Sequence, residues 1–405
     1  MADDLIRPDW VRRLNLFGAS VGDPALLVGL DPDELIETAL SSTGLSDFGD
    51  DDWEGPFRAI VRAMTESADL TVIGRLSARG ELLRCLQLRL RLHDLWRREP
   101  SVTAADVVAP VFILGPPRTG TSILLELLAL DPNLRPVVAH EAHHPLGPPV
   151  GVAATAAECS EPEQEFWADI QPEFMTMHEL RSDLPCECVH FCMPEFRSWH
   201  WPMMHDLGDV RHHEFGPVYA WHKRFLQTLQ HLDGSPQTFL LKSPAHLGSL
   251  ADLLVAYPDA RMIHTHRDPL KFVGSSANLT ATLHWMRSTS LDRAGRGPLM
   301  SLAYQLMLGL AMGQRESGEI PAAQMADLHF KDLLADPVTA ISQTYDHLGM
   351  ELPAEMRDTI PAYLAAKPKG KFGPHVYDAA SLSLDEGGVR EEFAAYIERY
   401  DISLE

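Results

Sequence analysis

The sequence of 405 residues is short of basic side chains, with 34 lysines and arginines against 57 aspartates and glutamates, and its formal net charge is −23. Proteins that bind nucleic acid through its phosphates need a basic surface, so this balance argues against a general nucleic-acid binder. It favours solubility and fits an enzyme that acts on small molecules. Any site for an anionic cofactor must therefore be basic locally, against a negative background.

Long apolar runs and a recognisable leader are also missing. No stretch of about 18 residues is apolar and free of charge, so no transmembrane helix is expected. The first ten residues contain Asp3, Asp4, Arg7 and Asp9 and lack both a basic start and an apolar centre, so no signal peptide is expected. These absences predict a cytoplasmic protein.

Cysteine is scarce, and the odd total of five fits a reducing compartment. Cys186, Cys188 and Cys192 form the spacing C-x-C-x-x-x-C, for which a zinc site is one interpretation. Structural zinc sites usually pair C-x-x-C groups or add well-spaced histidines, and this pattern matches neither arrangement well. We therefore interpret the three residues as reduced, packed cysteines and expect no bound metal.

The hydrophobic pattern divides the chain into a helical N-terminal extension over residues 1–105 and an α/β domain over residues 106–405. In the extension, Asp31 followed by proline and by Glu34 is typical of a helix start, and the leucine-rich stretch 76–96 predicts an amphipathic helix. Residues 140–235 form an insertion rich in Trp, Phe, Met, His and Pro. We interpret it as an acceptor pocket or lid, with core packing of helices as the alternative for part of it.

Short apolar strands alternate with helices in the α/β domain. Strands are expected at 107–114, 134–138, 238–241 and 261–266, and helices at about 123–128, 246–257, 269–285, 299–317, 335–348, 353–365 and 388–399. Alternation of this kind predicts an α/β fold with a parallel sheet flanked by helices on both faces. Ligands in such sheets bind at the carboxyl ends of the strands.

The first expected strand leads into the loop Gly115-Pro116-Pro117-Arg118-Thr119-Gly120-Thr121-Ser122, after which a helix begins. Backbone N–H groups at such a junction point toward an anion, and the helix dipole adds to the attraction. An ordinary strand-to-helix turn is the alternative, but this combination of Gly, Arg, Gly and Thr-Ser is uncommon. Thr121 replaces the lysine of a Walker A loop, which argues against ATP or GTP hydrolysis.

Two more segments place reactive side chains after strands. Arg267 follows the strand 261–266, and Ser275 comes eight residues later, about two helical turns along, so the two can hold one phosphate. Lys242 and His246 follow the strand 238–241; the lysine can stabilise charge on a leaving oxygen, and a neutral imidazole can accept a proton. An Arg–Asp helix cap and a packed histidine are the structural alternatives.

Together these segments resemble the PAPS-dependent sulfotransferase family, in which PAPS is 3′-phosphoadenosine 5′-phosphosulfate, and most of all its bacterial and actinobacterial branch with a helical N-terminal extension. The resemblance spans about residues 107–400, with specific motifs near 115–122, 242–246 and 265–275. It implies a P-loop-like sheet and a 5′-phosphosulfate loop in which Arg118 contacts the transferring sulfuryl group. It also implies Lys242 as the catalytic lysine and Arg267 with Ser275 at the 3′-phosphate.

The site residues implied by the resemblance fall into two groups. The catalytic candidates are Arg118, Lys242 and His246. The candidates for cofactor binding are Gly115, Arg118, Thr119, Gly120, Thr121, Ser122, Arg267, Ser275 and Lys371, the last from a basic glycine-rich loop at 369–375 that resembles one closing over the 3′-phosphate.

The function implied is transfer of a sulfuryl group from PAPS to a hydroxyl of a small, apolar acceptor, without a metal and with adenosine 3′,5′-bisphosphate as the second product. A P-loop kinase using ATP and Mg²⁺ and a catalytically inactive nucleotide-binding scaffold are the alternatives. The base remains open among His246, Glu141, His178 and Glu187. The identity of the acceptor and the existence of a homodimer also remain open.

Overall fold

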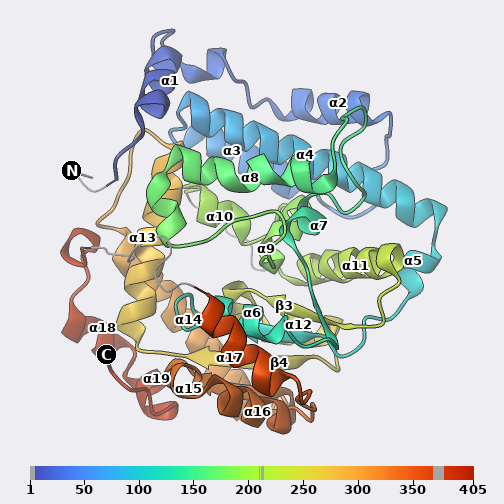
Figure 1. Cartoon of the computed structure of the whole chain (residues 1–405). Coiled ribbons are helices and arrows are strands. Elements are labelled where there is room, and N and C mark those ends of the chain that lie inside the picture. The colour runs from blue at the N-terminus through green and yellow to red at the C-terminus, as the bar shows by residue number, and fades with distance from the viewer. Residues whose placement is uncertain (1–4, 209, 211–213, 368–377) are drawn as a thin grey trace.

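A parallel β-sheet lies in the lower half of the computed structural model as seen in Figure 1; the structure describes residues 5–208, 210, 214–367 and 378–405. Its strand order is β2-β3-β1-β4-β5, formed by β1 (Val111–Leu114), β2 (Leu134–Pro136), β3 (Thr238–Lys242), β4 (Arg261–His266) and β5 (Met325–His329). All neighbouring strands pair in parallel, so the predicted sheet is confirmed. The strand expected at 107–114 begins only at Val111, since Ala109 has a left-handed φ of 44° and Pro110 has no N–H to donate.

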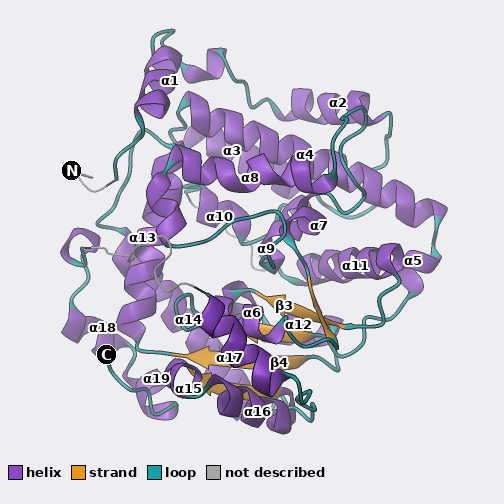
Figure 2. Ribbon diagram, in the orientation of Figure 1, coloured by secondary structure: helices purple, strands orange, loops and turns teal. Residues whose placement is uncertain are grey.

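The side chains of β1 alternate between two apolar layers, one on each face of the sheet. Val111 and Ile113 pack in a layer with α6 (Thr121–Leu128), α16 (Pro337–His347) and α17 (Met356–Ala366). Phe112 and Leu114 pack in the opposite layer, with α11 (Gly216–Asp233), α12 (Leu250–Ala256) and α14 (Arg296–Glu316). Because both faces are covered (Figure 2), the residues of β1 are apolar throughout, without polar alternation.

Most of the N-terminal helices run across the top of the view in Figure 1, away from the sheet, and the last of them lies lower, at the right beside α11. They are α1 (Asp9–Ala19), α2 (Pro32–Thr43), α3 (Glu54–Glu66), α4 (Val72–Arg98) and the short α5 (Ser101–Ala104). The predicted start of α2 is confirmed, because the Asp31 carboxylate accepts hydrogen bonds from the N–H groups of Asp33 and Glu34.

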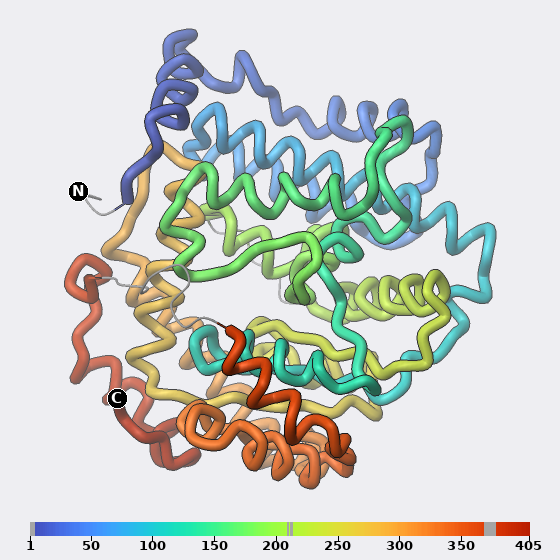
Figure 3. Tube along the Cα trace, viewed as in Figure 1, coloured from blue at the N-terminus to red at the C-terminus, as the bar shows by residue number. Residues whose placement is uncertain are grey.

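The insertion lies between these N-terminal helices and the sheet, as the green segments of Figure 3 show. Its helices are α7 (Ala139–His143), α8 (Ala156–Ile170), α9 (Cys188–Phe191), α10 (His200–Met204) and α11. Phe57 of α3 and Leu86 of α4 share one apolar core with Phe196 and Trp201 of the insertion. The extension therefore buries its apolar side against the insertion, and a division of the chain at residue 105 stays a prediction.

The remaining helices are α13 (Pro269–Arg287), α15 (Phe330–Ala335), α18 (Glu386–Glu392) and α19 (Ala394–Arg399), and the helix expected at 246–257 is a 3-10 turn η4 (Pro244–Gly248) followed by α12. Among them, α15 was not expected from the sequence, and the helix expected at 388–399 is divided into α18 and α19. Within the described parts of the chain, none of the helices combines the length and the apolar character that crossing a membrane requires.

Candidate active site

The loop between β1 and α6 is held close to the end of β4. Gly115 has φ 135°, and a Cβ on it would lie 2.4 Å from Thr265 Oγ1, so only glycine allows this approach. The Thr119 hydroxyl is buried and contacts the Pro116 carbonyl oxygen at 2.6 Å and Thr265 Oγ1 at 2.5 Å. The Thr119 hydroxyl therefore holds the loop in place. If Thr119 contacts a bound anion, it does so through its backbone N–H.

Arg118 lies at the tip of this loop in a left-handed conformation, with φ 70° and an exposed side chain. For a residue with a side chain that conformation costs about 1–2 kcal/mol, and such strain gathers at binding sites. Arg267, from the end of β4, donates a hydrogen bond from Nη1 to the Arg118 carbonyl oxygen at 2.8 Å. The two predicted anion-binding arginines are thus joined at one edge of the sheet.

Lys242 stands at the carboxyl end of β3 with a side chain only 4% exposed. Its Nζ donates to Glu187 Oε1 at 2.5 Å and to Ser122 Oγ at 3.4 Å. Glu187 immediately precedes α9, and Ser122 lies in the first turn of α6. The lysine therefore connects the predicted phosphate loop to the insertion, and it brings one of the open base candidates into the site.

His178 completes a group of charged and titratable side chains around Lys242. Burial above all, and then the positive charges of Lys242 and Arg118, lower its pKa to about 4, against the opposite effect of Glu187. For Glu187, burial favours a higher pKa, but the Lys242 ammonium and His178 outweigh it, so the carboxyl pKa is below its usual range. Arg118, His178, Glu187 and Lys242 thus form one electrostatic cluster at the carboxyl ends of β1 and β3.

The other two base candidates are engaged elsewhere. His246 is fully buried, its Nδ1 lies 2.7 Å from the Tyr219 hydroxyl, and burial lowers its pKa to about 3. Glu141 accepts a hydrogen bond from Arg135 at 2.7 Å and one from the Val138 N–H at 3.1 Å, so it caps α7. A role for His246 as the base stays a prediction, and this geometry supports Glu187 better.

Arg267, the arginine predicted to bind the 3′-phosphate, is paired with a carboxylate of the protein. Arg267 donates from Nε and Nη2 to the two carboxylate oxygens of Glu405, each at 2.7 Å, and its guanidinium lies 4.3 Å from the centre of the Phe330 ring. Two parallel N–H donors match a phosphate as well as a carboxylate. Ser275 is buried in α13, and Lys371 lies outside the described residues.

A cavity of about 270 Å³ opens between α4 and the insertion. Its lining combines apolar and polar side chains, among them Leu76, Glu81, Phe166, Trp167, His190 and Met193. His190 belongs to α9, three residues after Glu187, so the cavity adjoins the element that carries Glu187. The sequence contained no signal for the wall formed by α4, because its leucines and arginines have the pattern of any amphipathic helix.

Comparison with known proteins agrees with this arrangement. Residues 110–354, more than half of the chain, match the model of the sulfotransferase family. Over 277 residues the chain is 25% identical to the omega-hydroxy-beta-dihydromenaquinone-9 sulfotransferase Stf3 of Mycobacterium bovis and of Mycobacterium tuberculosis. That match covers 63% of this chain and 66% of the length of these curated relatives, which is just under two thirds.

Two solved structures are similar over nearly their whole length. Sulfotransferase STF9 from Mycobacterium avium has a TM-score of 0.77 and 26% identity, covering 92% of this chain and 97% of its own. Sulfotransferase STF1 from Mycobacterium tuberculosis has a TM-score of 0.75 and 26% identity, covering 90% of this chain and 98% of its own. With the matching family model and the loop, lysine and arginine described above, the chain belongs to the sulfotransferase family.

Proposed function

We propose that this protein transfers a sulfuryl group from PAPS to a hydroxyl of a small, apolar acceptor. The observation that carries the proposal is the contact of Lys242 with both Glu187 and Ser122, at 2.5 Å and 3.4 Å, beside the Arg118 loop. A lysine so placed can serve a leaving phosphate bound by the loop, and the carboxylate can serve the incoming hydroxyl. Membership of the sulfotransferase family supports the same reaction.

In the proposed mechanism the acceptor hydroxyl attacks the sulfur atom in line with the bond to the phosphate oxygen. Glu187 takes the proton of the hydroxyl as the new S–O bond forms. The bond between sulfur and the bridging oxygen breaks, and the electron pair stays on the phosphate of adenosine 3′,5′-bisphosphate. Lys242, Arg118 and the loop N–H groups stabilise the charge on that phosphate and on the sulfuryl oxygens.

The position of Arg267 favours PAPS over ATP as the donor. Its fork of two N–H donors binds a carboxylate in this structure, and a 3′-phosphate, which ATP lacks, presents the same pair of oxygens. Thr121 occupies the position of the lysine that a P-loop kinase uses on its phosphates. Both features count against the kinase alternative.

Turnover with PAPS and a panel of apolar alcohols and phenols tests the proposal. The expected result is release of adenosine 3′,5′-bisphosphate that depends on an added acceptor, with the matching sulfate ester detected by mass spectrometry. Transfer of phosphate from ATP–Mg²⁺ to the same acceptors would favour the kinase alternative. Tight bisphosphate binding without turnover on any acceptor would favour the inactive scaffold.

The cavity between α4 and α8 is the proposed acceptor site. It adjoins α9, and Phe166 and Trp167 give it an apolar wall. The name of the mycobacterial relatives, omega-hydroxy-beta-dihydromenaquinone-9 sulfotransferase, describes an acceptor that carries a hydroxyl, as the acceptor proposed here does. Trp199 and Trp201 of the same insertion pack against Phe215 and Phe196 instead, so their loss is expected to disturb the core.

Replacing Trp167 by alanine is expected to raise the acceptor KM about 10-fold, because a large apolar contact with the acceptor is lost. Affinity for adenosine 3′,5′-bisphosphate is expected to stay within about 2-fold, since Trp167 lies outside the proposed nucleotide site. Steady-state kinetics and calorimetry on the same preparation check both values, with Trp167→Phe as the conservative control. An unchanged KM, or an equal loss of acceptor and nucleotide binding, would argue against this cavity.

Replacing Glu405 by glutamine is expected to strengthen binding of adenosine 3′,5′-bisphosphate. The 3′-phosphate must displace the Glu405 carboxylate from Arg267, and an exposed ion pair of this kind contributes about 0.2–1 kcal/mol, which predicts a Kd about 1.4- to 5-fold lower. Calorimetric titration measures the change. Glu398→Gln on α19 is the control, because it removes the same charge without touching Arg267; equal Kd values for both variants would contradict the prediction.

A further inference from the structure

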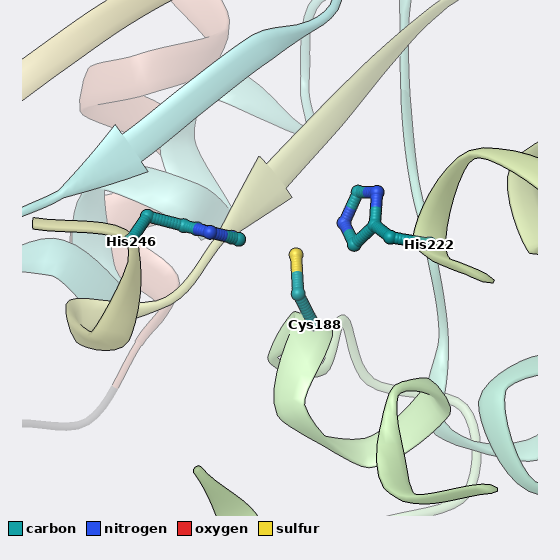
Figure 4. Close-up of side chains that lie close together, drawn as sticks. All are labelled: Cys188, His222 and His246. Atoms are coloured by element: carbon teal, nitrogen blue, oxygen red, sulfur yellow. The ribbon is translucent and has the colours of Figure 1, made fainter. Parts of the chain in front are cut away.

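Three buried side chains from separate elements lie close together beside the electrostatic cluster described above. Cys188 begins α9, His222 lies in α11, and His246 lies in η4, directly after β3. Their exposed fractions are 1%, 0% and 0%, and one ligand atom from each, the cysteine sulfur and two ring nitrogens, lies within 4.8 Å of the other two. Figure 4 shows the Cys188 sulfur between the two imidazole rings.

Both imidazoles are oriented by tyrosine hydroxyls. His222 Nδ1 lies 2.6 Å from the Tyr257 hydroxyl, and His246 Nδ1 lies 2.7 Å from the Tyr219 hydroxyl. The Nε2 atoms of the two histidines are buried and have no hydrogen-bond partner among the described residues. Metal-binding histidines characteristically fix one ring nitrogen in this way and use the other for the metal, whereas an unpaired buried nitrogen is otherwise costly.

We propose that Cys188, His222 and His246 bind a zinc ion. A thiolate with two imidazoles is a donor set that Zn²⁺ prefers, and bond lengths of about 2.0–2.1 Å to nitrogen and 2.3 Å to sulfur imply ligand atoms roughly 3.5 Å apart. The three atoms now lie within 4.8 Å of one another, so each separation has to shorten by about 1.3 Å at most, which side-chain rotation allows. Binding replaces the thiol proton, which leaves to solvent, and a water molecule takes the fourth position.

The surroundings of the sulfur connect the site to catalysis. The backbone of Lys242 forms a hydrogen bond with Cys188, and Glu187 is the preceding residue. An ion at this position would fasten α9 and α11 to the end of β3. It would therefore hold Lys242 and Glu187 in position relative to each other. The ion would not touch the substrates, so this is a positioning site. This inference does not depend on the proposed function.

A second cluster of possible ligands, His264, His266 and Asp327, does not support a similar proposal. Both carboxylate oxygens of Asp327 already accept hydrogen bonds from Arg315, at 2.6 Å and 2.8 Å, and His266 Nε2 lies 2.9 Å from the same carboxylate. Because the Arg315 guanidinium already neutralises the Asp327 carboxylate, binding of a metal cation at the same carboxylate is disfavoured. In the cysteine cluster, by contrast, none of the three ligands is a carboxylate held by an arginine, and each histidine has one ring nitrogen beside a tyrosine hydroxyl and the other unpaired.

The test is the zinc content and the cobalt spectrum of the full, untagged chain. After removal of metal by a chelator, titration with Zn²⁺ and dialysis, elemental analysis is expected to find one zinc ion per chain in the wild type and in Cys192→Ser. The latter is a matched control that alters a neighbouring buried cysteine outside the cluster. Cys188→Ser and His222→Gln are expected to retain less than about a tenth of that amount.

Co²⁺ added to the wild type is expected to give a thiolate-to-cobalt charge-transfer band, which Cys192→Ser keeps and Cys188→Ser loses. This measurement on wild type and Cys192→Ser decides the matter even if Cys188→Ser does not fold. A wild type that retains no zinc, a cobalt complex without the charge-transfer band, or a folded Cys188→Ser variant with undiminished zinc would each overturn the proposal.

Discussion

Replacing Lys242 by alanine is expected to lower kcat by about 10²- to 10³-fold, the usual effect of removing one fixed group that stabilises developing charge. The affinity for adenosine 3′,5′-bisphosphate should fall much less, because Arg267 and the loop N–H groups remain. The physical reason is the position of Nζ, between Ser122 of the phosphate loop and the Glu187 carboxylate. Single-turnover kinetics at saturating PAPS measure the effect on the chemical step itself.

The variant also leaves the Glu187 carboxylate without its cation in a largely buried place, so a loss of stability could imitate a loss of catalysis. The double variant Lys242→Ala/Glu187→Gln removes that uncompensated charge and is expected to fold; it is a control for stability only, because Glu187→Gln alone is expected to slow turnover. Lys223→Ala, a half-buried lysine that donates to the Ala256 carbonyl oxygen at 3.4 Å, is the control and should keep the wild-type rate. Wild-type kcat in a folded Lys242→Ala variant would exclude the proposed role.

Replacing Glu187 by glutamine is expected to lower kcat by about 10²- to 10⁴-fold, the range typical of losing a positioned proton acceptor. The amide keeps the size of the side chain and can still accept a hydrogen bond from Lys242, whose Nζ lies 2.5 Å from Glu187 Oε1. Folding and bisphosphate affinity should therefore change little. The measurement is kcat with a saturating acceptor, together with the Kd of the bisphosphate.

Two further variants separate Glu187 from its neighbour. Glu187→Asp keeps a carboxylate on a shorter side chain and is expected to be faster than Glu187→Gln. If only the length of the side chain mattered, Glu187→Asp would be the slower of the two. His178→Ala should be less severe than Glu187→Gln, because His178 interacts with Lys242 through its charge, whereas Glu187 accepts a hydrogen bond from it. If His178→Ala abolished turnover while Glu187→Gln remained active, the base would be His178.

Much of the sheet and the phosphate loop could be predicted from the sequence, because both are encoded by residues close together in the chain. The apolar runs of β1, β3 and β4, and the pattern from Gly115 to Ser122, depend on local patterning and on backbone geometry that only glycine allows at Gly115. The strand β5 was missed. Its sequence Met-Ala-Asp-Leu-His contains Asp327, whose carboxylate lies in hydrogen-bond contact with Arg315 and His266. Because this charged residue interrupts the apolar residues, the segment lacks the pattern of a buried strand.

The arrangement of the site depended on contacts between distant residues, which spacing does not reveal. Glu187 reaches Lys242 across 55 positions, and Glu405 reaches Arg267 across 138 positions. The predicted base His246 is turned toward Tyr219, because η4 packs its ring inside the core. Likewise, the spacing of Cys186, Cys188 and Cys192 was an unconvincing zinc pattern, since the histidines beside Cys188 come from α11 and η4.

The measurement that tests the central claim most directly is thermal unfolding with adenosine 3′,5′-bisphosphate, AMP or ATP–Mg²⁺ at equal concentrations. A ligand that binds only the native state must raise Tm. The account predicts a clear rise with the bisphosphate alone, and loss of that rise in Arg267→Ala, because Arg267 is the proposed partner of the 3′-phosphate. A rise with ATP–Mg²⁺ and none with the bisphosphate would contradict the assignment of this site to PAPS.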